Sequence, residues 1–236
     1  MPIFQNILRN AHYQKIEEKR LKYLFQSQFN NRSLLDIGCG QGRHLELLRP
    51  YCSKISGIDI NPEQIQALKN KGFDVFLPNE LPDEKYDILL MSHVVEHLST
   101  TDLIGFIENY LPLLKEDGHL IILTPIPGIR FWYDYTHVRP YTPQSFGMLF
   151  GIINAPAEFS TTIKMQLDDI YFFKDSWRIR NNRSYFILPN KKTNISTKIT
   201  QKLIAFVNIL GAGLHIASNG YFGALASWMG IYKKKN

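Results

Sequence analysis

Residues Ser33 to Leu48 read SLLDIGCGQGRHLELL, and this stretch decides the fold. A strand-like apolar run at 34–37 breaks into a glycine-rich turn at 38–42, and a helical pattern of leucines follows. A strand, a glycine turn and a helix in this order are typical of a nucleotide-binding βα unit. Glycine permits the positive φ of a tight turn and lets a ligand approach bare backbone, while the helix N-terminus directs free N–H groups at that ligand.

The spacing of the glycines separates two kinds of ligand. The dinucleotide fingerprint is G-x-G-x-x-G. Here the third glycine, Gly42, comes one residue early, and Arg43 stands where the dinucleotide pattern has glycine. Asp36 lies just before the turn. A carboxylate there would repel a pyrophosphate but suits an ammonium group, so the pattern favours a ligand that carries an amino group.

Composition limits the class of protein. The 236 residues predict one domain with a small appendage, and 44% hydrophobic and 13% aromatic residues can fill its core. The net charge of +6 comes partly from the tail Lys233–Lys235. No basic stripe is interleaved with aromatic residues, so nucleic acid is not an expected partner. Cys39 and Cys52 give neither a disulfide framework nor a metal-ligand spacing, and the polar stretch 1–10 is no secretory signal. We therefore expect a cytoplasmic protein.

Apolar runs alternate with helical patterns through the first half of the chain. Strands are expected at 34–37, 54–59, 73–76, 86–91 and 119–124, helices at 61–71 and 101–114, and a turn at 115–118. This alternation predicts an α/β fold with a doubly wound parallel sheet. Ligands bind at the carboxyl ends of such strands, and Gly38, Asp59 and Ser92 all lie at such ends. Asp59 is about twenty residues beyond the glycines, where an acid accepts hydrogen bonds from ribose hydroxyls.

The second half completes the predicted sheet. A helix is expected from Thr142 to about Phe150, a sixth strand at 159–167 and an antiparallel last strand at 224–232, giving seven strands in a Rossmann-like sheet. Residues 1–31 form a helical lead-in that is either a lid over the cofactor or a helix on the sheet edge. Residues 32–167 form the ligand-binding core. Residues 168–236 add an insertion over the active face at 168–194, an amphipathic helix and the last strand.

Four segments occur in the order and spacing of a known family. They are LLDIGCGQGRHLELL, GIDINPEQIQAL, KYDILLMSHVVEHL and LLPLLKEDGHLIILTP, and together they resemble small-molecule class I S-adenosylmethionine (SAM)-dependent methyltransferases. The resemblance implies that the methionine end of SAM is wrapped by Asp36, Gly38, Gly40 and Gly42. It implies that Asp59 binds the ribose, that Ile60 packs against the adenine, and that Ser92 and His93 border the reactive end. Many relatives carry an acid after the third strand that accepts the adenine amino group. This chain has Asn79 there instead, so Asn79 or backbone would take that role.

Methyl transfer needs alignment of nucleophile, methyl group and sulfur, and a hydroxyl acceptor also benefits from a histidine base. His137 is the first candidate, and His93 and His97 are the others. The run H-V-V-E-H invites comparison with the zinc signature H-E-x-x-H, but the glutamate adjoins the wrong histidine and no third ligand is evident, so no metal is expected. Glu96 and His97 could equally be a structural pair.

The run FWYDYTHVRPYT at 131–142 predicts the acceptor site. It follows the fifth strand, and it combines aromatic surface with a few polar groups, as small-ligand pockets do. The substrate-binding candidates are Trp132, Tyr133, Asp134, Tyr135 and Arg139. Arg139 would hold a phosphate or carboxylate, or else form a salt bridge with Asp134. The run resembles, more loosely, a segment of methyltransferases from cell-surface glycan and lipid-linked saccharide pathways.

The expected function is methyl transfer from SAM to a hydroxyl of a saccharide, lipid-linked or other small-molecule acceptor. A catalytically inactive SAM-binding partner subunit and a dinucleotide oxidoreductase are the alternatives. In the expected C-terminal helix, Ile199, Leu203, Phe206, Val207 and Leu210 make an apolar stripe. We expect this stripe to pack on the core or on another subunit of a homo-oligomer. A peripheral helix at the inner membrane face through 198–217, or a transmembrane span, are the other interpretations.

Overall fold

The structure is a computed structural model that describes residues 6–8, 10–81, 83–154, 159–180 and 194–235. The chain divides into two compact units. Unit 1 consists of residues 1–19 and 173–226, and unit 2 consists of residues 20–172 and 227–236. Unit 2 contains the glycine turn, the predicted catalytic histidines and the aromatic loop. Residues 227–236 thus belong with the core, and residues 1–19 belong with 173–226.

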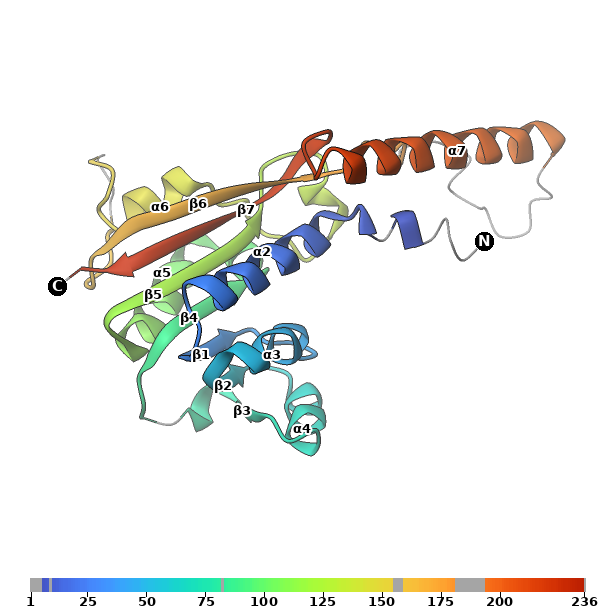
Figure 1. Ribbon diagram of the computed structural model, residues 1–236. Coiled ribbons are helices and arrows are strands. Elements are labelled where there is room, and N and C mark those ends of the chain that lie inside the picture. The colour runs from blue at the N-terminus through green and yellow to red at the C-terminus, as the bar shows by residue number, and fades with distance from the viewer. Residues whose placement is uncertain (1–5, 9, 82, 155–158, 181–193, 236) are drawn as a thin grey trace. The chain divides into compact units, whose positions relative to one another are not determined.

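Seven strands form one sheet in the order β3-β2-β1-β4-β5-β7-β6 (Figure 1). The strands are β1 (Arg32–Ile37), β2 (Cys52–Ile58), β3 (Asp74–Phe76), β4 (Tyr86–Ser92), β5 (Leu114–Pro125), β6 (Met165–Asp175) and β7 (Ala224–Lys234). Strands β1 to β5 pair in parallel, and β7 runs antiparallel to β5 with Ile121 opposite Ile231. The predicted fold class is confirmed. Because β1 lies between β2 and β4, the strand order reverses at β1, where ligands of such sheets bind.

The helices follow the strands as the sequence indicates. They are α2 (Tyr13–Ser27), α3 (Arg43–Leu48), α4 (Pro62–Asn70), α5 (Thr100–Tyr110), α6 (Pro143–Leu149) and α7 (Ile195–Ala217). Side chains cap two of these helices: the Asn61 side chain accepts from the backbone N–H groups of Glu63 and Gln64, and the Thr142 side chain accepts from that of Ser145. These caps fix the starts of α4 and α6, which follow the loops after β2 and β5.

The core of unit 2 is the sheet packed against α5 and α6. Strands β1 and β4 are buried along nearly their whole length. Trp228 on β7 is fully buried among Phe146 and other core side chains, and its indole N–H donates to the carbonyl of Tyr141 at 2.9 Å. This bond holds the end of the aromatic loop on the core.

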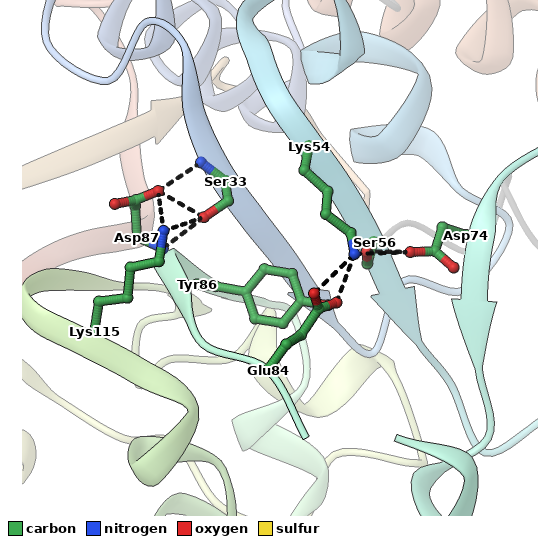
Figure 2. A network of polar contacts seen from close by, with 8 residues as sticks. All are labelled: Ser33, Lys54, Ser56, Asp74, Glu84, Tyr86, Asp87 and Lys115. Carbon is green, nitrogen blue, oxygen red and sulfur yellow. Dashed lines mark hydrogen bonds and ion pairs between the residues drawn. The ribbon is translucent and has the colours of Figure 1, made fainter. Parts of the chain in front are cut away.

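Polar side chains pin the opposite, amino-terminal edge of the sheet (Figure 2). Asp87 Oδ2 at the start of β4 accepts from the backbone N–H of Ser33 at 2.9 Å and pairs with Lys115 Nζ at 3.0 Å. Partial burial opposes ionisation of Asp87, but the hydrogen bonds from Ser33 and Lys115 outweigh it and lower its pKa to about 2. Beside this group, Lys54 Nζ pairs with Glu84 at 2.7 Å. The network ties together the first residues of neighbouring strands.

Three sequence-based predictions in this region are wrong. Residues 115–118 belong to the long strand β5, in which Asp117 has a φ of 59°. The predicted strand at 159–167 starts only at Met165 and runs to Asp175, so the first part of the predicted insertion 168–194 is strand. The run FSTTI at 159–163 has the residue pattern of a strand, but Thr161 makes hydrogen bonds within a loop instead. Its hydroxyl donates to the carbonyls of Leu149 and Ile163. Ser176 to Arg180 follow the strand, and 181–193 lie outside the described residues.

Packing of the apolar stripe of α7 on the core is the third wrong prediction, whereas packing of the stripe on another subunit stays a prediction. The buried residues of this helix are Ile204, Asn208, Ala212 and His215. The apolar stripe expected to pack on the core is exposed instead: Ile199 is 62%, Leu203 61%, Phe206 58%, Val207 41% and Leu210 52% exposed. An amphipathic pattern shows that one face is apolar, but it does not show what covers that face.

Candidate active site

The glycine turn is fixed by backbone geometry at the carboxyl end of β1. The N–H groups of Gly38 and Cys39 both donate to the carbonyl of Ile58 at the end of β2. Gly38 and Gly42 have φ values of +78° and +81°. A Cβ on Gly38 would meet Val94 Cγ2 at 2.4 Å. Glycine is therefore required at position 38 for both conformation and space.

Asp36 is a buried carboxylate near the carboxyl end of β1. It is 1% exposed, and neither oxygen accepts a hydrogen bond from the described residues. The nearest cation-forming group is His44, whose Nδ1 lies 3.9 Å from Oδ2. Burial raises the pKa of Asp36 to about 7; Arg43 lowers it and Asp59 raises it. A buried acceptor of this kind needs a partner, and the ammonium group of an amino-acid ligand would supply one.

Asp59 joins the end of β2 to the glycine turn. Its Oδ2 accepts from the N–H of Gly40 at 2.8 Å, and its Oδ1 accepts from the N–H of Asn61 at 2.9 Å. Each carboxylate oxygen can accept a second hydrogen bond, so Asp59 can hold the turn and two ribose hydroxyls together. The sequence predicted the ribose role but gave no sign of the role in the turn.

The predicted adenine contacts, Ile60 and Asn79, are both exposed. Ile60 is 84% exposed, which fits an apolar platform for a flat ring. Asn79 is also exposed, in the short helical turn Pro78–Glu80. Glu80 was overlooked as an acid after the third strand. Its carboxylate accepts from the N–H of Leu77 and pairs with Lys69, each at 3.3 Å, and these bonds lower its pKa.

Ser92 and His93 lie at the carboxyl end of β4. Ser92 is 7% exposed, and its hydroxyl has no hydrogen-bond partner among the described residues. His93 has a φ of 57°, which is uncommon for a residue with a side chain and is concentrated at functional sites. Its Nδ1 lies 3.2 Å from Oε1 of Glu96. This turn therefore presents a buried hydroxyl and an oriented imidazole at the edge where the ligand is expected.

Glu96 connects the turn after β4 to the aromatic loop after β5. It is fully buried, and its Oε2 accepts from the hydroxyl of Thr124 at 3.1 Å. Its backbone carbonyl accepts from the N–H groups of Val138 at 2.8 Å and Arg139 at 3.2 Å. These bonds place the adjoining His137 beside the turn, so Glu96 has the structural role considered above as an alternative.

His97 and His137 share one tautomer. His137 Nδ1 lies 2.8 Å from the carbonyl oxygen of Phe131, and His97 Nδ1 lies 3.1 Å from that of Thr136. A carbonyl can only accept, so each Nδ1 carries the proton and each neutral ring keeps its lone pair on Nε2. The two ring centroids are 5.0 Å apart. Both rings are thus oriented to act as bases through Nε2.

Glu96, His97 and His137 also gather ligand atoms that could hold a metal ion. One such atom from each residue lies within 4.8 Å of the others. The sequence showed no third ligand for the H-V-V-E-H run because His137 comes forty residues later. Both Glu96 oxygens already have hydrogen-bond partners, His93 and Thr124. Metal-free chemistry stays a prediction.

The predicted substrate-binding residues form the outer part of the loop. Trp132, Tyr133 and Tyr135 are 62%, 49% and 97% exposed. Asp134 accepts from the N–H and hydroxyl of Thr136, and these bonds lower its pKa. Arg139 donates to the hydroxyl of Thr100 at 2.8 Å, so its partner in the described chain is Thr100 rather than Asp134. Substrate binding by these residues stays a prediction.

Comparison with known proteins agrees with this geometry. The family model of a methyltransferase domain matches residues 8–151, and the chain belongs to that family. A ubiquinone biosynthesis O-methyltransferase of Pelagibacter ubique is 28% identical over 65% of this chain and 72% of its own length. An ajmaline N-methyltransferase of Rauvolfia serpentina is 33% identical over 40% of this chain and 36% of its own length.

Solved structures share the fold. The N-methyltransferase NodS of Bradyrhizobium japonicum, in complex with S-adenosylhomocysteine (SAH), has a TM-score of 0.57 at 12% identity. The match covers 99% of this chain and 98% of NodS. A SAM-dependent methyltransferase of Archaeoglobus fulgidus has a TM-score of 0.56 at 22% identity, over 93% of this chain and 94% of its own. The chain is therefore a SAM-dependent class I methyltransferase, and the dinucleotide alternative is excluded.

Proposed function

We propose that the enzyme methylates a hydroxyl group of a saccharide, a lipid-linked molecule or another small acceptor, with His137 as general base. The observation that carries the proposal is the fixed tautomer of His137, whose Nδ1–H points at the carbonyl of Phe131 at 2.8 Å. A hydroxyl is a poor nucleophile until a base takes its proton, whereas an unprotonated amine needs no base. His97 and His93 are the alternative bases.

The residues divide the work between donor and acceptor. Bound SAM supplies a methyl group on a positively charged sulfur. Asp36 holds its ammonium group, Asp59 its ribose hydroxyls, and Ile60 its adenine. His137 Nε2 accepts the proton of the acceptor hydroxyl as the oxygen–methyl bond forms and the sulfur–methyl bond breaks. The aromatic side chains Trp132 and Tyr133 hold the acceptor and exclude water.

The names of the relatives support methyl transfer, but they do not decide between an oxygen and a nitrogen acceptor. The Pelagibacter ubique relative is named as an O-methyltransferase and the Rauvolfia serpentina relative as an N-methyltransferase. An oxygen acceptor agrees better with two histidines that both keep Nε2 unprotonated in one loop cluster.

The test compares His137→Ala with His97→Ala. SAH release is measured with a panel of phenols, saccharides and lipid-linked saccharides against a panel of amines. Loss of His137 should lower kcat about 10²- to 10⁴-fold, the usual contribution of a general base, and leave SAH affinity unchanged. His97→Ala should lower kcat less, since this ring is the more exposed of the two.

Four results would contradict the proposal. Wild-type kcat in His137→Ala would exclude this base, and turnover of amines alone would exclude the hydroxyl acceptor. Activity lost in EDTA and restored by Mg²⁺ or Zn²⁺ would assign Glu96, His97 and His137 to metal binding. SAH binding without turnover of any acceptor in the panel would favour the inactive partner subunit.

A further inference from the structure

The helix α7, orange to red in Figure 1, carries a continuous apolar stripe on its exposed face. Positions 199, 203, 206, 210 and 214 recur at helical spacing and therefore share one side. Leu214 extends the stripe, at 55% exposed, and Ile195 begins it at 78%. An exposed apolar face more than five turns long is unusual on a soluble protein, where such patches mark interaction sites.

The opposite face of α7 is held by unit 1 itself. Asn208 accepts from the N–H of Ile179 at 2.7 Å and donates to its carbonyl at 3.2 Å, as a neighbouring strand would. A Cβ on Gly211 would meet the carbonyl oxygen of Trp177 at 2.5 Å, so the helix and this segment are in close contact. The helix is thus fixed along one side, and the apolar stripe is presented on the other.

Charge is distributed unevenly between the two units. Unit 1 contains 11 Lys and Arg residues and 3 Asp and Glu residues, a net charge of +8, whereas unit 2 has 16 and 18, a net charge of −2. Residues 176–236 contain no acidic residue at all. On α7 itself, Lys198 and Lys202 are exposed. This distribution is complementary to an anionic surface, and Lys or Arg flanking an apolar stripe is typical of helices that lie in a membrane interface.

A transmembrane role for α7 conflicts with its connections. Its length and mean hydropathy of 1.4 would allow a span. However, β6 and β7 belong to one sheet, so the chain that leaves β6 and the chain that enters β7 must be on the same side of a membrane. If α7 crossed the bilayer, residues 176–194 would have to cross it too. That segment contains Arg178, Arg180, Arg183, Lys191 and Lys192, which are costly in hydrocarbon.

We propose that α7 is an interfacial helix that docks the enzyme on an anionic lipid bilayer. The helix axis lies in the plane of the membrane, the stripe from Ile199 to Leu214 enters the boundary of headgroups and acyl chains, and Lys198 and Lys202 contact lipid phosphates. Trp177 and Tyr221 of the same unit are 57% and 81% exposed, and these aromatic residue types are enriched at membrane interfaces. The inference goes beyond methyl transfer and does not depend on the acceptor.

Co-sedimentation of the full-length chain with vesicles tests the docking. One set of vesicles is phosphatidylcholine alone, and the other contains 30% phosphatidylglycerol. We expect the protein to bind the anionic vesicles at least tenfold more tightly than vesicles of phosphatidylcholine alone. Binding to the anionic vesicles should weaken as the salt concentration is raised. Phe206→Glu should reduce binding to anionic vesicles tenfold or more, and Lys198→Gln with Lys202→Gln should reduce both binding and its salt dependence.

Phe159→Glu is the matched control, because Phe159 in unit 2 is 57% exposed and Phe206 is 58% exposed. It should change vesicle binding less than twofold, and unchanged SAH affinity would show that both variants are folded. Equal binding of wild type and Phe206→Glu would overturn the proposal. The proposal would also be overturned if the wild type is a dimer that binds no vesicles and if Phe206→Glu dissociates this dimer. The stripe would then be a contact between two copies of the chain. Resistance to extraction by alkaline carbonate would indicate a spanning helix instead.

Discussion

The proposed methyl-donor half of the active site and the proposed acceptor half are held in place by different means. On the donor side, Gly38 and Asp59 are held by backbone hydrogen bonds between the ends of neighbouring parallel strands. On the acceptor side, Trp132 and Tyr135 are exposed on a loop, and their positions depend on a few bonds through Glu96 and His137. A rigid donor half suits a cofactor that never changes, while a loop-borne acceptor half lets one fold serve many acceptors.

The largest effect is expected from Gly38→Ala in the donor half. The new Cβ would lie 2.4 Å from Val94 Cγ2 in a backbone with φ +78°. Strain and displacement of the turn should weaken SAH binding by about 2–4 kcal/mol, in the range of severe single substitutions. Titration calorimetry measures the loss. Gly72→Ala is the matched control, because its backbone has a similar φ of +77° and an added Cβ would meet nothing within 4 Å, and an equal loss in both variants would contradict the steric account.

Asp59→Ala should have the next largest effect. The substitution removes the acceptor of two backbone N–H groups as well as the acceptor for the ribose hydroxyls. We expect SAH affinity to fall by about 1–3 kcal/mol, the range for hydrogen bonds to a charged group. Asp59→Asn keeps a side-chain acceptor and should lose less. If SAH affinity in both variants equals that of wild type, Asp59 is not in the cofactor site.

The smallest effect is expected in the acceptor half. Trp132→Ala should raise the KM for the acceptor a few-fold and leave SAH affinity unchanged. Its free energy of unfolding should change by less than about 0.5 kcal/mol, because the side chain is 62% exposed. Phe159→Ala, of similar exposure, should leave KM unchanged. A KM effect of the same size in both variants would show that the aromatic loop does not bind the acceptor.

The sequence predicted where the residues of the proposed donor half lie, because they are local to strand ends, whereas their contacts with SAM stay predictions. Gly38, Asp59 and Ser92 each terminate a strand whose apolar run can be read directly, and parallel pairing brings such ends together. It did not predict the contact of His137 with His97. That contact depends on how the loop after β5 folds back on Glu96, through bonds to backbone carbonyls that no residue type reveals.

The C-terminal part shows a second limit of prediction from sequence. The last strand was predicted close to its observed range because it is a plain apolar run. The start of β6 was misplaced because Thr161 and Thr162 have the β-branched side chains of a strand but make loop bonds to Leu149 and Glu108. The buried face of α7 was inverted because the polar Asn208, which pairs with the backbone of Ile179, lies on the buried side.

The pH dependence of SAH binding to wild type and Asp36→Asn tests the central claim most directly, namely that the donor half is built around an ammonium group. Burial raises the pKa of Asp36 to about 7. The ammonium group of SAH binds the ionised carboxylate of Asp36. Below the pKa of Asp36, its carboxyl group must first lose a proton, so the affinity for SAH must fall as the pH falls. Calorimetry should show wild-type affinity about tenfold lower at pH 5.5 than at pH 7.5, with release of a proton. Asp36→Asn should bind more weakly at pH 7.5 and show a flat profile. A flat wild-type profile, or an unchanged slope in Asp36→Asn, would contradict the account.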